Sequence, residues 1–104
     1  MIRYRYHFVV TLGRFNDAVK WVNDLNAASV AAGLTAGKLW APAFGTANSV
    51  VYEVEYADWT SFHKENDIFN GNADCMRILR EGTSLNAAGQ IPWDEALEEA
   101  PTLA

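Results

Sequence analysis

The chain has 104 residues, half of them hydrophobic and a fifth charged, which suits one folded domain and excludes a disordered polypeptide. The net charge of −5 argues against a nucleic-acid partner, because phosphate binding needs clustered Lys and Arg. The chain has one cysteine, Cys75, and no apolar run long enough to span a membrane, so we expect a cytoplasmic protein with no membrane partner.

Residues 2–12 alternate between two kinds of side chain, which predicts a β-strand because successive strand residues point to opposite faces. One face is aromatic and aliphatic, whereas the other carries two arginines and a histidine. The first face comprises Ile2, Tyr4, Tyr6, Phe8, Val10 and Leu12, and the second comprises Arg3, Arg5, His7, Val9 and Thr11.

Residues 15–32 change to helical spacing, with one apolar stripe and with Gly33 suited to end the helix. Trp21 falls outside that stripe, so we expect it to pack against another element. Residues 34–44 are a weaker strand candidate, because Pro42 belongs on an edge strand or at a bulge.

Residues 49–56 alternate again and predict a second well-marked strand. A helix capped by Asp58 or Thr60 is expected next. Residues 70–72 interrupt this helix, and Gly82 ends its second piece.

The end of the chain combines weak strand character with acidic side chains. We expect a last strand within residues 85–93, so that residues 1–93 form the domain. Residues 94–104 are then an acidic, solvated tail with a short helical turn near its start. The acidic side chains of this segment are Asp94, Glu95, Glu98 and Glu99.

The order β-α-β-β-α-β predicts an α+β, ferredoxin-like fold with a four-stranded antiparallel sheet in the order 4-1-3-2 and both helices on one face. The two well-marked strands then lie side by side, and one register pairs opposite charges as well as aromatic and β-branched side chains. That register sets Arg3 opposite Glu55, Arg5 opposite Glu53, His7 opposite Val51, Tyr4 opposite Val54, Tyr6 opposite Tyr52 and Phe8 opposite Val50.

The opening strand IRYRYHFVV (residues 2–10), the stretch VVYEVEYADW (residues 50–59) and the interrupted helix up to Gly82 resemble the dimeric α+β barrel superfamily. The layout is most similar to its antibiotic-biosynthesis-monooxygenase-like and NIPSNAP-like branches. The likeness covers nearly the whole chain and is one of pattern. It implies a homodimer joined through the open sheet faces, with a barrel interior that holds a hydrophobic small molecule. Some relatives oxidise polycyclic aromatic substrates without a metal or cofactor, so no cofactor is expected.

On the open face, His7 is the first candidate for a general base, because a histidine titrates near neutral pH. Glu53 is a second candidate for the base, and Arg5 is placed to hold the resulting anion. Haem-degrading relatives carry an asparagine on the first strand where this chain has His7, which argues against haem chemistry. The alternative is that His7 forms a hydrogen bond within the dimer interface.

Further side chains are candidates for substrate binding: Arg3, Arg5, Trp40, Glu55, Trp59 and His63. Each also has a structural interpretation. The arginines and glutamates form a cross-strand ladder of ion pairs. Trp40 then belongs to the dimer interface, Trp59 covers the core and His63 is solvated. No metal-binding motif is present.

Two functional hypotheses follow. The first is a cofactor-independent oxygenase or isomerase that acts on a hydrophobic or aromatic molecule. The second is a non-catalytic ligand-binding or assembly protein whose open sheet face serves mainly as the dimer interface. An aromatic cavity beside His7 favours the first hypothesis, whereas an open face occupied by Arg–Glu pairs favours the second.

Overall fold

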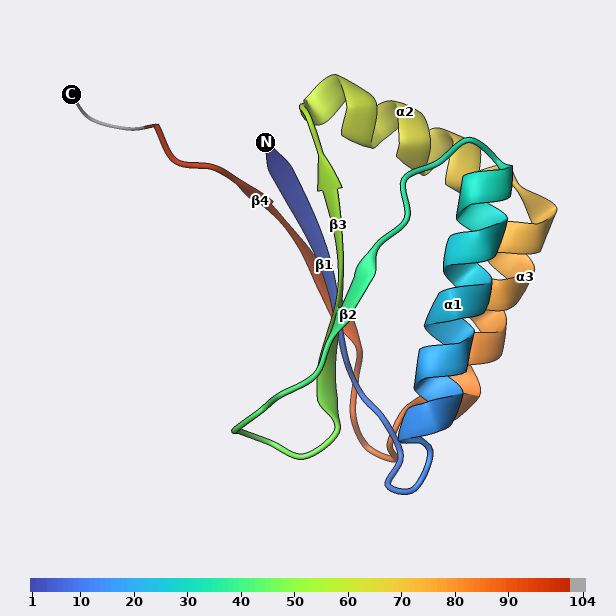
Figure 1. Ribbon diagram of the computed structural model, residues 1–104, viewed down its shortest axis with the longest axis vertical. Coiled ribbons are helices and arrows are strands. Elements are labelled where there is room, and N and C mark those ends of the chain that lie inside the picture. The colour runs from blue at the N-terminus through green and yellow to red at the C-terminus, as the bar shows by residue number, and fades with distance from the viewer. Residues whose placement is uncertain (102–104) are drawn as a thin grey trace.

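The computed structural model describes residues 1–101 as a four-stranded antiparallel sheet with helices on one face (Figure 1). The strand order β2-β3-β1-β4 confirms the predicted ferredoxin-like α+β fold. Along the chain the elements are β1 (Ile2–Val9), α1 (Phe15–Ala31), β2 (Lys38–Trp40), β3 (Ser49–Tyr56), α2 (Trp59–Asn70), α3 (Ala73–Glu81), the 3-10 helix η1 (Gly82–Leu85) and β4 (Trp93–Glu98).

The two central strands, β1 and β3, pair in the register that the sequence predicts. All six predicted pairs are present, from Arg3 opposite Glu55 to Phe8 opposite Val50. Because a shift by one residue would turn each strand over, this register fixes which side chains face the helices. The aromatic face of β1 points toward the helices, and the face that carries His7 is left open.

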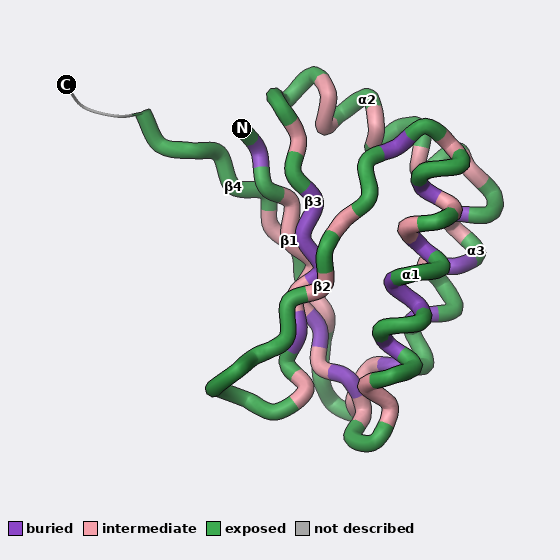
Figure 2. Tube along the Cα trace, in the orientation of Figure 1, coloured by how far each residue is buried: buried purple, intermediate pink, exposed green. Residues whose placement is uncertain are grey.

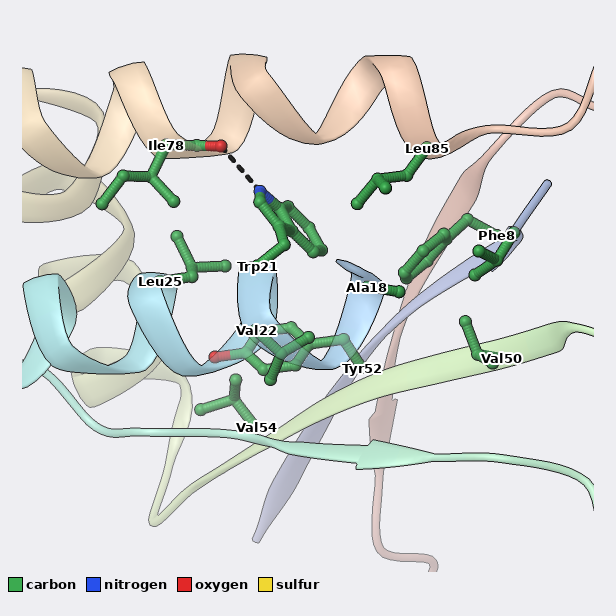
Figure 3. Packing of buried hydrophobic residues seen from close by; sticks show 11 residues of the cluster. Phe8, Ala18, Trp21, Val22, Leu25, Val50, Tyr52, Val54, Ile78 and Leu85 are labelled. Atoms are coloured by element: carbon green, nitrogen blue, oxygen red, sulfur yellow. Dashed lines mark hydrogen bonds between the residues drawn. The ribbon is translucent and has the colours of Figure 1, made fainter. Parts of the chain in front are cut away.

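The hydrophobic core lies between α1 and the two central strands (Figure 3). Trp21 is buried, and its indole Nε1–H donates a hydrogen bond to the carbonyl oxygen of Ile78 at 2.7 Å. The same ring meets Phe8 edge-on, with 5.6 Å between the ring centroids. The expectation that Trp21 packs against another element is therefore confirmed, because it joins α1 to both α3 and β1.

The interrupted helix is two helices, each with its own cap. Asp58 begins α2 by accepting a hydrogen bond from the backbone N–H of Ser61 at 2.8 Å. Asn72 begins α3 by accepting one from the backbone N–H of Cys75 at 3.0 Å. None of the residues of α2 is fully buried (Figure 2), and its partly buried Phe69 packs against the core.

The last strand differs from the prediction. It was expected within residues 85–93, but β4 is Trp93–Glu98, and it pairs antiparallel with β1. Leu85 instead ends η1 and is buried in the core. The sequence pattern was misleading because β4 is an edge strand, and an edge strand tolerates exposed acidic side chains. Of the predicted tail, residues 94–98 therefore belong to the sheet, and residues 102–104 lie outside the described part of the chain.

The first two predicted strands are shorter than expected. β1 ends at Val9, and the backbone N–H of Thr11 then donates to the carbonyl oxygen of Leu85 at 2.8 Å. This turn toward η1 leaves Leu12 exposed to 77%, so its predicted place on the helix-facing side is wrong. Between residues 34 and 44, only Lys38–Trp40 pairs with β3.

No helix in residues 1–101 combines the length and apolar character that a membrane-crossing segment requires.

Candidate functional site

A cavity of about 470 Å³ lies between the sheet and the helices, a volume that suits a small organic ligand. One wall is the helix-facing side of the strands. The opposite wall comes from α1, α2, α3 and η1. Aromatic rings supply much of the lining, namely Tyr4, Tyr6, Phe8, Trp21, Tyr52, Tyr56, Phe62 and Phe69.

All four tyrosines of the chain line this cavity, but their hydroxyl groups have different roles. The Tyr52 hydroxyl donates to Oδ1 of Asn26 at 2.6 Å and accepts from the backbone N–H of Gly37 at 3.2 Å. A Cβ atom at Gly37 would lie 2.5 Å from the Tyr52 ring, so a glycine is needed at this close approach. The hydroxyl of Tyr52 is thus used to attach β2 and α1 to the sheet.

The hydroxyls of Tyr6 and Tyr56 make no hydrogen bond within residues 1–101. Because no buried side-chain polar atom in that range lacks a partner, these two hydroxyls must reach open space. Burial and the nearby Asp94 charge raise the pKa of Tyr6, while burial and the Glu65 charge raise the pKa of Tyr56 to about 12. Both phenols therefore stay protonated at neutral pH and can donate hydrogen bonds to a ligand.

Tyr4 and Asp94 form a pair at the β4 side of the cavity. The Tyr4 hydroxyl donates to Oδ2 of Asp94 at 3.0 Å. Burial, together with this carboxylate, raises the pKa of Tyr4 well above its usual value. The ring of Tyr4 also packs against Phe62 of α2, with the centroids 6.1 Å apart. This pair therefore places a carboxylate beside aromatic rings.

Two further charged side chains line the cavity. Arg80 of α3 donates from Nε to the carbonyl oxygen of Met76 at 3.1 Å, and its guanidinium forms no ion pair within the described residues. Glu65 of α2 accepts from the backbone N–H of Thr35 at 2.6 Å and from the Thr35 hydroxyl at 2.9 Å. Arg80 therefore has guanidinium donors to offer to a ligand, whereas both carboxylate oxygens of Glu65 are already engaged.

The open face of the sheet carries paired charges. Arg5 contacts Glu53 at 2.8 Å, and this glutamate is only 9% exposed. The ends of Arg3 and Glu55 are 3.2 Å apart and about half exposed. Each of these charges is neutralised by the residue opposite to it on the neighbouring strand.

His7 also has its partners on the open face. Its Nε2 lies 3.1 Å from Oε1 of Glu95, and its ring stacks on Trp93 with 3.8 Å between the centroids. Both partners come from β4, the strand that the sequence analysis placed elsewhere. The surroundings of His7 were therefore not predictable from the expected elements.

The cavity lies on the opposite face of the sheet from the predicted site. None of the eight predicted site residues lines it. Six of them share the open face, namely Arg3, Arg5, His7, Trp40, Glu53 and Glu55. Trp59 and His63 lie at the start of α2, where both rings pack against Phe62 and Trp59 donates from Nε1 to Glu98 at 3.2 Å.

Four residues of the cavity are not among those predicted from the sequence as site residues: Tyr4, Tyr56, Arg80 and Asp94. One signal was available: each central strand carries two tyrosines on its helix-facing side. Four phenols are more polar than a sealed core requires, because each buried hydroxyl needs a partner. The sequence gives no comparable signal for Arg80. No pattern in the sequence distinguishes it from the other charged residues of α3. In residues 1–101, no three His, Cys, Asp or Glu side chains are grouped as metal ligands would be.

No protein-family model and no curated protein match this chain, but solved structures do. An uncharacterized NIPSNAP domain protein from Burkholderia xenovorans is 16% identical with a TM-score of 0.74, covering 100% of this chain and 99% of that one. A NIPSNAP family protein from Agrobacterium tumefaciens is 11% identical with a TM-score of 0.73, covering 95% and 92%. An antibiotic biosynthesis monooxygenase is 11% identical with a TM-score of 0.71, covering 97% and 100%.

Because these identities are low, the comparisons show the fold alone and do not show an activity or a ligand. The resemblance inferred from the sequence is confirmed at that level. The chain has the ferredoxin-like α+β fold of the NIPSNAP-domain and antibiotic biosynthesis monooxygenase structures.

Proposed function

We propose that this protein binds a hydrophobic, ring-bearing small molecule in the helix-side cavity and transforms it without a cofactor, as an oxygenase or isomerase. The observation that carries the proposal is the cavity of about 470 Å³ with aromatic walls and with two hydroxyls, those of Tyr6 and Tyr56, that have no partner in the described part of the chain. Aromatic walls favour a flat apolar ligand, and a few fixed polar groups orient it.

The polar groups of the cavity suit a reaction that begins with removal of a proton. Tyr6 and Tyr56 are donors to a carbonyl or phenol oxygen on the ligand, and Arg80 stabilises the negative charge that develops there. In an isomerisation, the proton returns to a different atom of the ligand. In an oxygenation, the anion gives an electron to dioxygen, its carbon forms a C–O bond with the resulting superoxide, the peroxide takes up the abstracted proton, and loss of water leaves a carbonyl group on the ligand. This chain shares its fold with an antibiotic biosynthesis monooxygenase, which is consistent with the second reaction.

The open face is proposed to join two copies of the chain into a homodimer. Its charges are paired, while Trp40 and Trp93 are each 54% exposed and Leu97 is 40% exposed. Exposed apolar side chains among neutralised charges are typical of a surface that another protein covers. In this arrangement Arg5, Glu53 and His7 stabilise the interface.

The free cysteine, Cys75, fits the expected cytoplasmic location.

The ligand proposal is tested by calorimetric titration of the protein with 2-naphthol. We expect one binding site per chain. Val54→Phe extends a ring into the cavity and should abolish binding, whereas Val30→Phe adds the same ring on an exposed part of α1 and should leave binding unchanged. Binding that survives Val54→Phe in the folded variant, or no binding by the parent protein, would contradict the proposal.

The dimer proposal is tested by sedimentation at several protein concentrations. Trp40→Glu places a charge on the open face and should shift the protein to monomers. Phe44→Glu is the control, because Phe44 is 97% exposed in the loop between β2 and β3. A parent protein that sediments as a monomer would refute the proposed interface.

A further inference from the structure

We propose that Asp94 is the general base of the cavity and that Tyr4 positions its carboxylate, an assignment that rests on the proposed function. Asp94 comes from the edge strand β4, and its side chain lines the cavity from the helix-facing side of the sheet. The Tyr4 hydroxyl holds Oδ2 at 3.0 Å, while Oδ1 makes no hydrogen bond within residues 1–101. One oxygen is thus anchored and the other is available to a ligand.

The other groups that line the cavity are poor candidates for this role. Among the described residues lining it there is no histidine, lysine or cysteine. Glu65 is the second carboxylate, but Thr35 engages both of its oxygens through its backbone N–H and hydroxyl. The phenols of Tyr6 and Tyr56 keep their protons at neutral pH, because burial moves their pKa values above the ordinary value of 10.0. Asp94 is the remaining side chain that can accept a proton.

The residues around Asp94 suit proton transfer from an aromatic substrate. Tyr4 packs against Phe62, and Tyr6 lies directly opposite Asp94 in the pairing of β1 with β4. A ring in the cavity therefore comes close to the carboxylate. Arg80 lines the same cavity and favours the anion that remains after the proton leaves.

The step can be tested with 5-nitrobenzisoxazole, a probe that needs only a base. Asp94 removes the proton from the ring carbon, and the C–H electrons form the nitrile as the N–O bond breaks. The product is a coloured cyanophenolate, and the proton stays on the carboxylate. No oxidant, reductant or metal takes part, so the rate reports proton abstraction alone.

We expect saturable elimination by the parent protein. Asp94→Asn should lower kcat by about 10²-fold or more, in the range that general-base catalysis contributes, with KM nearly unchanged. Asp94→Glu should restore part of the rate, because it returns a carboxylate to the same strand position. Glu99→Gln is the control, since Glu99 lies beyond the end of β4 and outside the cavity lining.

Tyr4→Phe tests the positioning role separately. Loss of the hydroxyl should reduce kcat several-fold and leave KM nearly unchanged, because the carboxylate loses its anchor while the walls of the cavity remain. Equal kcat values for the parent and Tyr4→Phe would remove Tyr4 from this role.

Failure of this assignment is distinguishable from failure of the proposed function. If 2-naphthol binds but Asp94→Asn eliminates the probe as fast as the parent, or the parent does not eliminate it at all, Asp94 is not the base and the ligand site stands. If neither 2-naphthol nor the probe binds to the parent protein, the proposed function falls and this assignment falls with it.

Discussion

The two faces of the sheet are built from the same alternating strands. They differ in whether their polar side chains have partners within the protein. On the helix-facing side, the hydroxyls of Tyr6 and Tyr56 have no hydrogen-bond partner among residues 1–101 and border a cavity. On the open side, Arg5 and Glu53 bind each other, and His7 lies between a glutamate and a tryptophan. The unused donors support the proposed ligand site, whereas the paired charges beside exposed apolar groups support the proposed dimer interface.

The comparison separates the side chain that the sequence predicts as a base from the cavity. His7 is the first candidate for a general base in the sequence, but it lies outside the cavity. The tyrosines are less reactive side chains, and they line the cavity. The following predictions compare residues between the two faces or within one of them, in order of decreasing effect.

Replacing a tryptophan should affect stability much more on the helix-facing side than on the open side. Trp21→Ala should lower the free energy of unfolding by about 3–5 kcal/mol, because it empties part of the core and removes the hydrogen bond to Ile78. In the Trp40→Glu background, which we expect to be monomeric, Trp93→Ala removes a half-exposed ring and should cost about 1 kcal/mol or less. Urea denaturation at one fixed protein concentration measures both, and equal losses would remove the contrast.

Within the open face, the two ion pairs should differ in their effect on stability. Arg5→Ala leaves the carboxylate of Glu53, which is 9% exposed, without its partner and should cost about 1–3 kcal/mol. Arg3→Ala breaks a half-exposed pair and should cost about 0–1 kcal/mol. The same denaturation experiment compares them. If Arg3→Ala lowered the stability as much as Arg5→Ala, burial would not determine how much each ion pair contributes.

Among the tyrosines, only a hydroxyl that is bonded within the protein should contribute to stability. Tyr52→Phe removes the hydrogen bonds to Asn26 and Gly37 and should cost about 1 kcal/mol. Tyr56→Phe removes a hydroxyl that has no partner in the described residues and should change the stability by less than about 0.5 kcal/mol. Thermal melting of the two variants measures the difference, and a larger loss for Tyr56→Phe would contradict this division of roles.

Alkaline pH should act through the helix-facing side. Burial raises the pKa of Tyr52 and of Tyr56 to about 12, from the ordinary value of 10.0. Because the folded protein holds these protons more tightly than the unfolded chain does, their contribution to stability is complete below pH 10. It is lost as the pH rises toward 12.

All four tyrosines line the cavity, so the ultraviolet absorbance of tyrosinate follows this face alone. We expect the folded protein to titrate at higher pH than the chain in denaturant, with no change near neutral pH. Coincident titration curves would show that the tyrosines are as accessible to water in the folded protein as in the unfolded chain.

Much of the fold could be predicted from the sequence, because alternation fixes both the strand and its faces. The pairing of Arg5 with Glu53 could be predicted from their opposite charges and from the two-residue period of side chains along a strand. β4 was missed because its acidic residues resemble a solvated tail. His7 then lacked its two neighbours in the prediction, since both come from β4.

The location of the cavity was beyond the reach of the sequence for a different reason. It depends on how α2 lies across the sheet after the cap at Asp58, with none of its residues fully buried. Local patterns state which face of a strand is apolar. They do not state whether the helices above it fill the space completely, because that depends on the distance between two layers.

The most direct test of the account follows the indole N–H signals of the protein by nuclear magnetic resonance during titration with 2-naphthol. Trp21 lines the cavity, whereas Trp40 and Trp93 lie on the open face. We predict that the Trp21 signal moves with increasing 2-naphthol and that the signals of Trp40 and Trp93 stay in place. Movement of the Trp40 or Trp93 signal with a stationary Trp21 signal would place the ligand on the open face and contradict the account.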